Sequence, residues 1–350
     1  MTTFEQLHAH GFGQVHFCGA QDVQLRAIIA IHDTRLGPAL GGCRFVEYSD
    51  EAAALTDALR LARAMTSKAA LASLAHGGGK AVIMRPAGDF DRGALFTAFA
   101  RFVDGLGGQY ITTADSGTGT EDMEVIRAAT PHVAGFGVEA GGSGDPSPYT
   151  ALGVRRGIEA MARVVLGRDD LQGLHVAVQG VGHVGYNLCR ELKDAGARLT
   201  LADVRETVAA EVAEELGAQT VPAARIHRVE CDVYAPCALG GALNDRTVGE
   251  LRCKLVAGAA NNQLATDRNG EMLMQRGIPY APDYAINAGG LINVAQEVVG
   301  YDAEVARVRT LRVYDTIVEI AERAASSSTP AHRIADAMVA EKLAAAGEAR

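Results

Sequence analysis

Residues 176–185 have the sequence Val-Ala-Val-Gln-Gly-Val-Gly-His-Val-Gly, and this stretch decides the fold of the chain. Its apolar start predicts a strand, and a G-x-G-x-x-G pattern follows directly and opens a helical pattern that runs to Ala195. The first glycine of such a motif permits a tight turn, the second lets the backbone approach a pyrophosphate, and the third lets helix and strand pack closely. The sequence therefore predicts a Rossmann-type dinucleotide site formed by Gly180, Val181, Gly182, His183, Val184 and Gly185.

The next strand pattern, at 198–202, ends at an acidic residue, Asp203. It lies about 20 residues beyond the glycines, where the ribose-binding carboxylate of such a site is expected. A carboxylate that accepts hydrogen bonds from the adenosine ribose would repel a 2′-phosphate, so the sequence favours NAD over NADP as cofactor. Arg205 lies close enough in sequence to weaken that preference.

Strand and helix patterns alternate on both sides of the motif, which predicts an α/β fold with a doubly wound parallel sheet. Ser49 or Asp50 can cap a helix whose apolar face includes Met65 and whose end lies just before Lys68. Further helices are expected at 94–106, from about 150, and over 303–350 with a break near 326–330. Strands are expected at 25–31, 81–84, 109–113, 174–179, 198–202, 232–235 and 255–258.

A chain of 350 residues that is 48% hydrophobic is long enough for two domains. We expect an N-terminal α/β substrate-binding and catalytic domain at 1–135 and a Rossmann-type NAD-binding domain at 136–329. The turn-rich stretch 136–148 is the expected hinge. A last helix, at about 330–350, is expected to pack back on the first domain.

Charge and cysteine content exclude several classes of protein. The formal net charge of -9 argues against nucleic acid or an anionic membrane surface as a partner, and no apolar run is long enough for a membrane helix. The six cysteines include no C-x-x-C pair, and no His-Glu-x-x-His or similar cluster indicates a metal site. We therefore expect a cytoplasmic protein without a metal.

Three charged residues fall where strands and helices are expected to end: Lys68, Lys80 and Asp115. Lys80 follows three glycines that we interpret as a turn leading into the strand at 81–84. A buried lysine beside a second cation can act as a base, and a carboxylate can exchange a proton with a substrate amine. The glycines do not form a nucleoside triphosphate loop, because Leu74 and Ala81 stand where G-x-x-x-x-G-K-[ST] requires glycine and a hydroxyl residue.

With these residues in view, the chain resembles the Glu/Leu/Phe/Val dehydrogenase family, and is most similar to its leucine-specific members. The similarity extends in order from about residue 25 to about residue 300. The blocks that carry it are residues 36–44, 65–68, 77–80, 115–118, 146–148, 179–185, 235–241, 258–263 and 281–290.

The resemblance implies a catalytic lysine at Lys80, a proton-transfer acid at Asp115, and Lys68 with Asn262 on the substrate carboxylate. It also implies a homo-oligomer, an octamer or smaller, and oligomerisation through the N-terminal domain. Further substrate-binding positions implied are Leu40, Gly41, Gly42, Met65, Thr113, Leu291 and Val294. Thr150, Ala238 and Asn261 are the implied partners of NAD besides the glycine motif and Asp203.

The side chain of the substrate is expected to be apolar. Glutamate-specific relatives carry a lysine just before the paired glycines, where this chain has Leu40, and a second carboxylate buried there would lack a partner at a cost of several kcal/mol. Val294 is typical of leucine-specific members, whereas Leu291 and Thr113 depart from them. We therefore expect conversion of L-leucine and related branched-chain amino acids to 2-oxo acids and ammonia, with an aromatic amino acid as the alternative and a non-catalytic NAD-binding sensor as a distant one.

Overall fold

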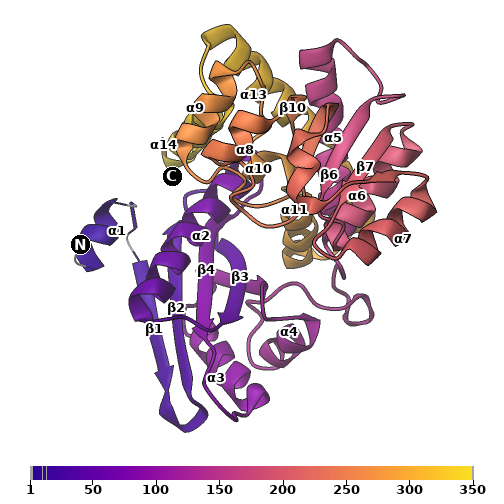
Figure 1. Cartoon of the computed structure of the whole chain (residues 1–350). Helices are drawn as coiled ribbons and strands as arrows, with labels where there is room; N and C mark the ends of the chain where they lie inside the picture. Colours follow the sequence, from indigo (N-terminus) through magenta and orange to yellow (C-terminus); the bar gives the residue numbers. More distant parts are fainter. Residues whose placement is uncertain (1–2, 10, 13, 349–350) are drawn as a thin grey trace. The chain divides into compact units, whose positions relative to one another are not determined.

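The computed structural model describes residues 3–9, 11–12 and 14–348, and the chain divides into two compact units (Figure 1). Unit 1 consists of Met1–Asp145, Val294–Ala303 and Glu341–Arg350. Unit 2 consists of Pro146–Asn293 and Glu304–Ala340. The first division falls at Asp145/Pro146, inside the turn-rich stretch 136–148, whereas we expected it at 135/136.

Polar contacts explain why residues 136–145 belong to unit 1. The Glu297 carboxylate accepts hydrogen bonds from the backbone nitrogens of Gly135 and Ser143, both at 2.7 Å. Arg127 donates to the carbonyl of Ala140 and its guanidinium lies 4.4 Å from the centre of the Phe136 ring. Such long-range contacts are invisible in a local sequence pattern.

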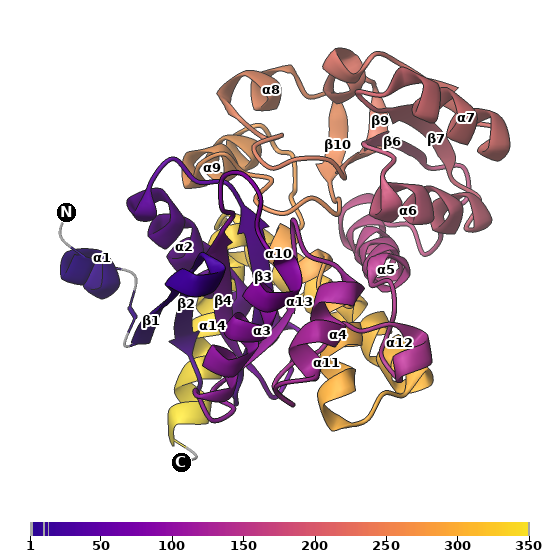
Figure 2. The ribbon, with the colours of Figure 1, turned by 90° about the horizontal axis from the view of Figure 1, so that it is seen from below.

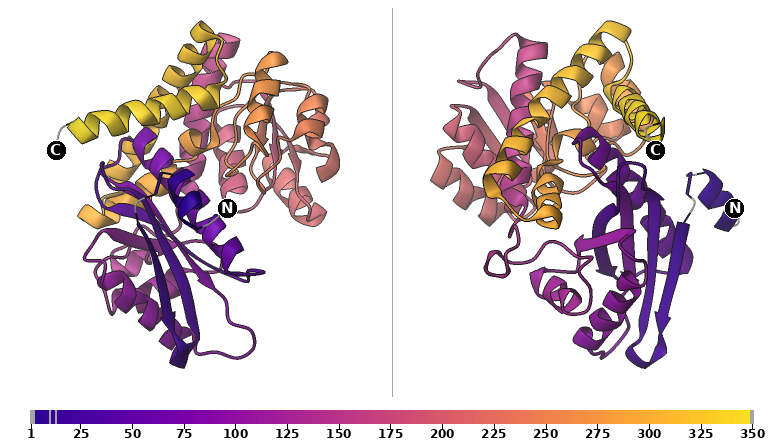
Figure 3. Two further views of the ribbon diagram at one scale, coloured as in Figure 1. Left: turned by 90° about the vertical axis from the view of Figure 1, so that its left-hand side faces the viewer. Right: turned by 180° about the vertical axis from the view of Figure 1, so that it is seen from behind.

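Unit 1 is built on a five-stranded mixed sheet in the order β1-β2-β4-β3-β5. β1 is antiparallel to β2 and β2 to β4, while β3 is parallel to both β4 and β5. Figure 3 shows β1 and β2 as neighbouring long strands. The bounds are β1 (Gln14–Ala20), β2 (Leu25–Asp33), β3 (Ala39–Val46), β4 (Gly77–Met84) and β5 (Tyr110–Ala114).

Both faces of this sheet are covered, because side chains alternate between them. Ile28 and Val82 pack with helix α2 (Glu51–Leu71) on one face. Ile29 and Ile83 pack with helix α3 (Arg92–Asp104) and with Met123 of helix α4 (Thr120–Arg127) on the other. Asp50, one of the two expected caps, caps α2 by accepting a hydrogen bond from the Ala53 nitrogen at 2.8 Å.

Unit 2 has a parallel five-stranded sheet in the order β10-β9-β6-β7-β8. If β6 is counted as strand 1 and the sheet is followed from the β8 edge to the β10 edge, the order is 3-2-1-4-5. This is the strand order of a Rossmann sheet, so the expected fold class is confirmed. A parallel bridge from Val256 to Tyr280 adds to the β10 edge. The strands are β6 (His175–Gln179), β7 (Arg198–Ala202), β8 (Gln219–Thr220), β9 (Cys231–Pro236) and β10 (Cys253–Val256).

Helices complete both units, and Figure 2 shows α5 and α6 together beside the strands of unit 2. The α-helices of unit 2 are α5 (Ser147–Leu166), α6 (His183–Asp194), α7 (Glu206–Leu216), α8 (Asp245–Glu250), α9 (Asp267–Gln275), α10 (Asp283–Ile286) and α13 (Val313–Ser327). α12 (Ala303–Leu311) also lies in unit 2 apart from its first residue, α1 (Thr3–Ala9) belongs to unit 1 with α2, α3 and α4, and α11 (Gly289–Ala295) and α14 (Ala331–Glu348) cross the division. In the described part of the chain no helix has the length and apolarity needed to cross a membrane.

Two local expectations were wrong. Gly77, Gly78 and Gly79 form no turn but are the first residues of β4, paired with β3 and β2. Lys68 does not lie past the end of a helix but in the last turn of α2, which continues to Leu71. Both differences arise because packing of α2 on β4 extends each element beyond what its local sequence favours.

Candidate active site

Three neighbouring parallel strands of unit 1 bring together a lysine, an arginine and a carboxylate. Cys43 of β3 is paired with Ala81 of β4 and with Ala114 of β5. Asp115 follows the second partner and so lies level with Arg44, whereas Lys80 precedes the first partner and reaches Asp115 with its side chain. The Lys80 Nζ atom lies 2.6 Å from Asp115 Oδ2, and Arg44 Nε lies 3.1 Å from the same oxygen.

This cluster is sheltered from solvent. The Lys80 side chain is 6% exposed and that of Asp115 is 23% exposed. Burial favours the neutral form of Asp115, but the charges of Lys80 and Arg44, with hydrogen bonds from Lys80 and the Ser116 backbone, outweigh it and lower the pKa of Asp115. Asp115 is therefore held as an ionised carboxylate.

The arginine is itself anchored by a second carboxylate on α2. Arg44 Nη1 donates to Asp57 Oδ2 at 2.8 Å, and the hydroxyl of Tyr48 donates to the same oxygen at 2.8 Å. Arg60 reaches the other oxygen of Asp57 at 3.0 Å. Burial opposes ionisation of Asp57, yet the hydrogen bonds from Arg60 and Tyr48 and the charge of Arg44 lower its pKa. Arg44 thus bridges two carboxylates.

Glycines make room for this arrangement. A Cβ atom on Gly42 would lie 2.8 Å from the Cβ of Asp115, and one on Gly79 would lie 2.8 Å from the Tyr110 ring. A Cβ on Gly78 would lie 2.6 Å from the Ala62 carbonyl oxygen of α2 and closer still to the Thr66 backbone nitrogen. Gly78 therefore allows close packing of β4 against α2, and Gly79 makes room for the Tyr110 ring.

The other predicted substrate residues are divided between the units. Leu40 is buried on β3, Thr113 is buried on β5, and Gly41 meets Met65 of α2, whose Cγ would lie 3.5 Å from a Cβ on that glycine. In unit 1 these residues join Lys68 and Val294, and in unit 2 lie Asn262 and Leu291. Their roles toward a substrate stay predictions.

The glycine motif in unit 2 has the geometry that a dinucleotide requires. Gly180 has φ +95° and turns the chain sharply after β6. Gly182 is the N-cap of α6, and a Cβ there would have no neighbour within 4 Å, which leaves space for a pyrophosphate at the helix N-terminus. A Cβ on Gly185 would collide with the Gly180 carbonyl, so this glycine is required for helix and strand to pack. His183 and Val184 open the helix.

Asp203 lies beside this turn, at the end of β7. Its Oδ2 accepts a hydrogen bond from the Val181 backbone nitrogen at 2.9 Å, and its Oδ1 accepts one from the Arg205 backbone nitrogen at 2.9 Å. Burial tends to raise the pKa of Asp203, but the two backbone hydrogen bonds and the Arg205 side chain outweigh this effect and keep the pKa below its ordinary value. The carboxylate is therefore ionised and tied to the glycine turn.

The remaining predicted cofactor residues surround the glycine turn or the neighbouring loops. Ala238 packs on Gly180, where a Cβ would lie 2.8 Å from its own Cβ. Thr150 lies in the first turn of α5, and its Oγ1 would be 2.6 Å from a Cβ on Gly290. The Asn287 side chain donates to Asn261 Oδ1 at 2.8 Å and to the Ala259 carbonyl at 2.9 Å, which holds the loop after β10.

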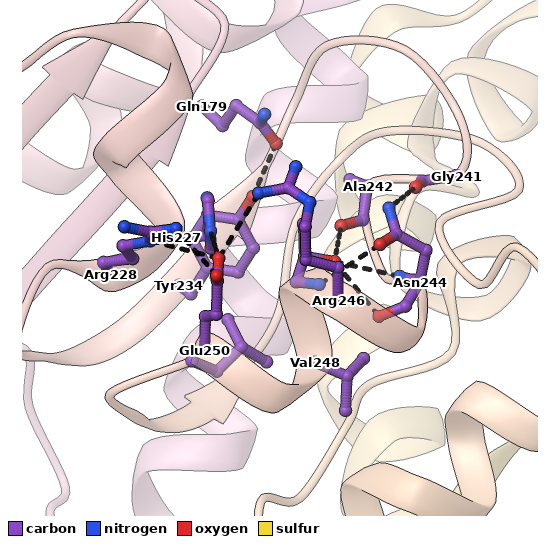
Figure 4. Close-up of polar contacts among 12 residues, drawn as sticks. Gln179, His227, Arg228, Tyr234, Gly241, Ala242, Asn244, Arg246, Val248 and Glu250 are labelled. Atoms are coloured by element: carbon purple, nitrogen blue, oxygen red, sulfur yellow. Dashed lines mark hydrogen bonds and ion pairs between the residues drawn. The ribbon is translucent and has the colours of Figure 1, made fainter.

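A second polar cluster in unit 2 has a structural function (Figure 4). Glu250 at the end of α8 accepts hydrogen bonds from His227 at 2.7 Å and from Arg228 and Arg246. Tyr234 of β9 donates to Gln179 at 2.5 Å. Asn244 caps α8 through the Thr247 nitrogen. These contacts join α8 to the preceding 3-10 turn (Ala223–Arg228) and connect β9 to the residue before Gly180.

Sequence reasoning missed Arg44, Asp57 and Asn287 as members of the site. Arg44 and Asn287 lie inside blocks that matched the family, so their position in those blocks was an available signal. Asp57 had no such signal, because one acidic residue on a helix is usually a solvated surface group.

Comparisons with known proteins match the whole chain. Residues 14–132 match the family model described as Glu/Leu/Phe/Val dehydrogenase, dimerisation domain. Residues 141–211 and 199–349 match the model for Glutamate/Leucine/Phenylalanine/Valine dehydrogenase.

Individual relatives agree with these models. A leucine dehydrogenase of Geobacillus stearothermophilus is 48% identical, covering 100% of this chain and 95% of the relative. A phenylalanine dehydrogenase of Thermoactinomyces intermedius is 43% identical, covering 97% and 93%. The crystal structure of an L-tryptophan dehydrogenase from Nostoc punctiforme has a TM-score of 0.88 at 42% identity and covers 99% of each chain.

Proposed function

The chain belongs to the Glu/Leu/Phe/Val dehydrogenase family, and from this premise we propose that it catalyses the reversible, NAD-dependent oxidative deamination of L-leucine and related branched-chain amino acids. The reaction consumes the amino acid, NAD⁺ and water and yields the 2-oxo acid, ammonium, NADH and a proton. The observation that carries the proposal is the 2.6 Å contact between the buried Lys80 amine and the Asp115 carboxylate.

Each residue of the cluster has a chemical task in this reaction. NAD⁺ supplies the hydride acceptor. Asp115 accepts a proton from the substrate amine and later returns one to the departing ammonia. Lys80, once it has released its own proton, removes a proton from the water that attacks the substrate iminium carbon. Lys68 and Asn262 hold the α-carboxylate, and Gly41 and Gly42 line the floor of the substrate site.

The absence of a charged group at position 40 supports an apolar substrate. Leu40 is 1% exposed, and Thr113, Leu291 and Val294 are also buried. None of these four described side chains carries a positive charge that could pair with a second carboxylate. Burying such a carboxylate unpaired would cost several kcal/mol. Leucine, valine and isoleucine carry no such group.

NAD is the proposed cofactor because the ionised Asp203 would repel a 2′-phosphate. We place its pyrophosphate on Gly180 to Gly185 and its nicotinamide side near Thr150 and Asn261. A homo-oligomer is proposed because the model matched by residues 14–132 describes a dimerisation domain. The six cysteines are free thiols, which suits a cytoplasmic location.

A substrate panel tests the proposal. The purified chain is mixed with NAD or NADP and one of leucine, valine, isoleucine, phenylalanine, tryptophan or glutamate, and NADH or NADPH formation is followed at 340 nm. The proposal expects the highest kcat/KM with leucine and NAD. The Lys80→Ala variant should lose turnover while NAD still binds. Lys254→Ala is the matched control, because this lysine is exposed and pairs with Asp232 in unit 2.

An aromatic amino acid is the second candidate substrate, favoured by Leu291 and by the phenylalanine and tryptophan dehydrogenases among the relatives. One methylene in a pocket changes discrimination by about 1–3 kcal/mol, so pocket residues shift the preference without abolishing other substrates. A kcat/KM for phenylalanine above that for leucine would select this candidate. If none of the amino acids in the panel is converted, both candidate functions are refuted.

A further inference from the structure

Two cationic side chains contact Asp115, and both contact the same carboxylate oxygen. Lys80 Nζ and Arg44 Nε both contact Oδ2, at 2.6 and 3.1 Å. An arginine guanidinium is planar, so a second bond made by the same group fixes the direction of the first. Arg44 makes that second bond to Asp57 Oδ2 at 2.8 Å.

We propose that Arg44, anchored by Asp57, is a positioning residue that holds the Asp115 carboxylate with Oδ2 toward Lys80 and assigns Oδ1 to the substrate amine. This inference rests on the proposed function, in which Asp115 exchanges a proton with that amine. Neither Arg44 nor Asp57 needs to touch the substrate. Their effect reaches the reaction through the orientation and charge of Asp115.

The anchor is built to be rigid. Asp57 lies on α2, and its oxygens also accept hydrogen bonds from Tyr48 and Arg60. The side chains of Arg44 and Asp57 are 23% and 17% exposed, so solvent screens their interaction less than it would a surface ion pair. The single positive charge of Arg44 can balance the charge of only one of its two carboxylates, Asp57 or Asp115. The positive charge of Lys80 balances the other, because Lys80 pairs with Asp115.

The other titratable groups near Asp115 do not compete for this task near neutral pH. Burial raises the pKa of the Cys43 thiol to about 11. Burial also raises the pKa of Tyr48 and of Tyr110, so both hydroxyls keep their protons. In the described part of the chain, Lys80 and Arg44 form the ion pairs with Asp115 given above, and Asp57 lies behind the arginine.

The test compares Arg44→Gln, Arg44→Lys and Asp57→Asn with the wild-type enzyme across a pH range, using leucine and NAD. Loss of the cation raises the proton affinity of neighbouring groups, so the acid limb of kcat/KM should move to higher pH in Arg44→Gln. A misplaced carboxylate should lower kcat/KM about 10- to 100-fold, mostly through kcat. Arg44→Lys should restore the position of the acid limb but only part of kcat.

Arg63→Gln is the matched control, because Arg63 is an exposed arginine on the same helix, α2. It should behave as the wild type does. If Arg44→Gln does not fold, Asp57→Asn carries the test, since it keeps Arg44 and removes only the charge of its anchor. A wild-type pH profile in a folded Arg44→Gln enzyme, or an equal loss at every pH that Arg44→Lys does not relieve, would overturn the inference.

A crystal structure of Arg44→Gln separates this inference from the proposed function, because it needs no turnover. We expect the Asp115 carboxylate to rotate away from its wild-type orientation. An unchanged carboxylate would overturn the positioning role even in an active enzyme. Absence of amino acid turnover in the wild type would instead refute the proposed function.

Discussion

Replacing Gly78 by alanine tests whether the glycines of β4 exist to seat Lys80 against α2. The added methyl group would lie 2.6 Å from the Ala62 carbonyl oxygen and nearer still to the Thr66 nitrogen, and both atoms are backbone that cannot rotate away. The strand must therefore move outward from the helix. Lys80 lies two residues further along the same strand and must move with it.

The expected magnitude follows from this collision. Overpacking a filled core costs about 1–3 kcal/mol, and contact with backbone on a helix favours the upper end of that range. At about 2–4 °C per kcal/mol for a folding unit the size of unit 1, the melting temperature of that unit should fall by about 6–12 °C. A displacement of Lys80 by about 1 Å should lower kcat roughly 100-fold.

The assay is differential scanning calorimetry together with leucine-dependent NADH formation at a temperature where the variant is folded. Gly93→Ala serves as the control, because Gly93 lies in α3 of the same unit and a Cβ there would have its nearest neighbour at 3.5 Å. That variant should stay within about 1 kcal/mol of the wild type, since alanine favours a helix. A Gly78→Ala enzyme with wild-type melting temperature and kcat would refute the packing argument.

Three further predictions concern the cofactor, the hinge and metals. Asp203→Ser should raise the Michaelis constant for NAD about tenfold or more and narrow the preference over NADP, since a hydrogen bond to a charged group contributes about 1.5–3 kcal/mol; unchanged steady-state constants would argue against ribose binding by Asp203. Glu297→Gln should destabilise unit 1 by about 1–3 kcal/mol in urea titrations, because two backbone nitrogens lose a charged acceptor, and an unaltered midpoint would contradict this. Dialysis against EDTA should leave turnover unchanged, because the described residues contain no cluster of three or more metal-ligating side chains, and loss of activity that Zn²⁺ or Mg²⁺ restores would reveal a metal requirement.

Local patterns were sufficient for the cofactor motif. The order strand, Gly180-x-Gly182-x-x-Gly185, helix needs only neighbours in sequence, and the three glycines have the three distinct environments that the motif predicts. The position of Asp203 was equally predictable from the sequence, because the end of the next parallel strand must lie at the same edge of the sheet.

Local patterns misled where glycines entered a strand. Glycine is unfavourable in strands, so residues 77–79 indicated a turn before Lys80. Only the packed structure reveals that Asp33, α2 and Tyr110 approach these three residues too closely for any side chain. The constraint is steric and comes from distant segments, and it does not appear in the propensities of the residues themselves.

The glycine turn from Gly180 to Gly185 repeats a known local arrangement and could be predicted from the sequence alone. Lys80 and Asp115 were also selected from the sequence, and their catalytic roles stay predictions. The strand order β4-β3-β5 decided that Arg44 would meet Asp115 across 71 residues of chain, and the packing of α2 decided that Asp57 would hold Arg44. Tertiary structure likewise assigned residues 294–303 to unit 1. The physical reason is that hydrogen bonds and ion pairs depend on distance in space, whereas a sequence pattern records only distance along the chain.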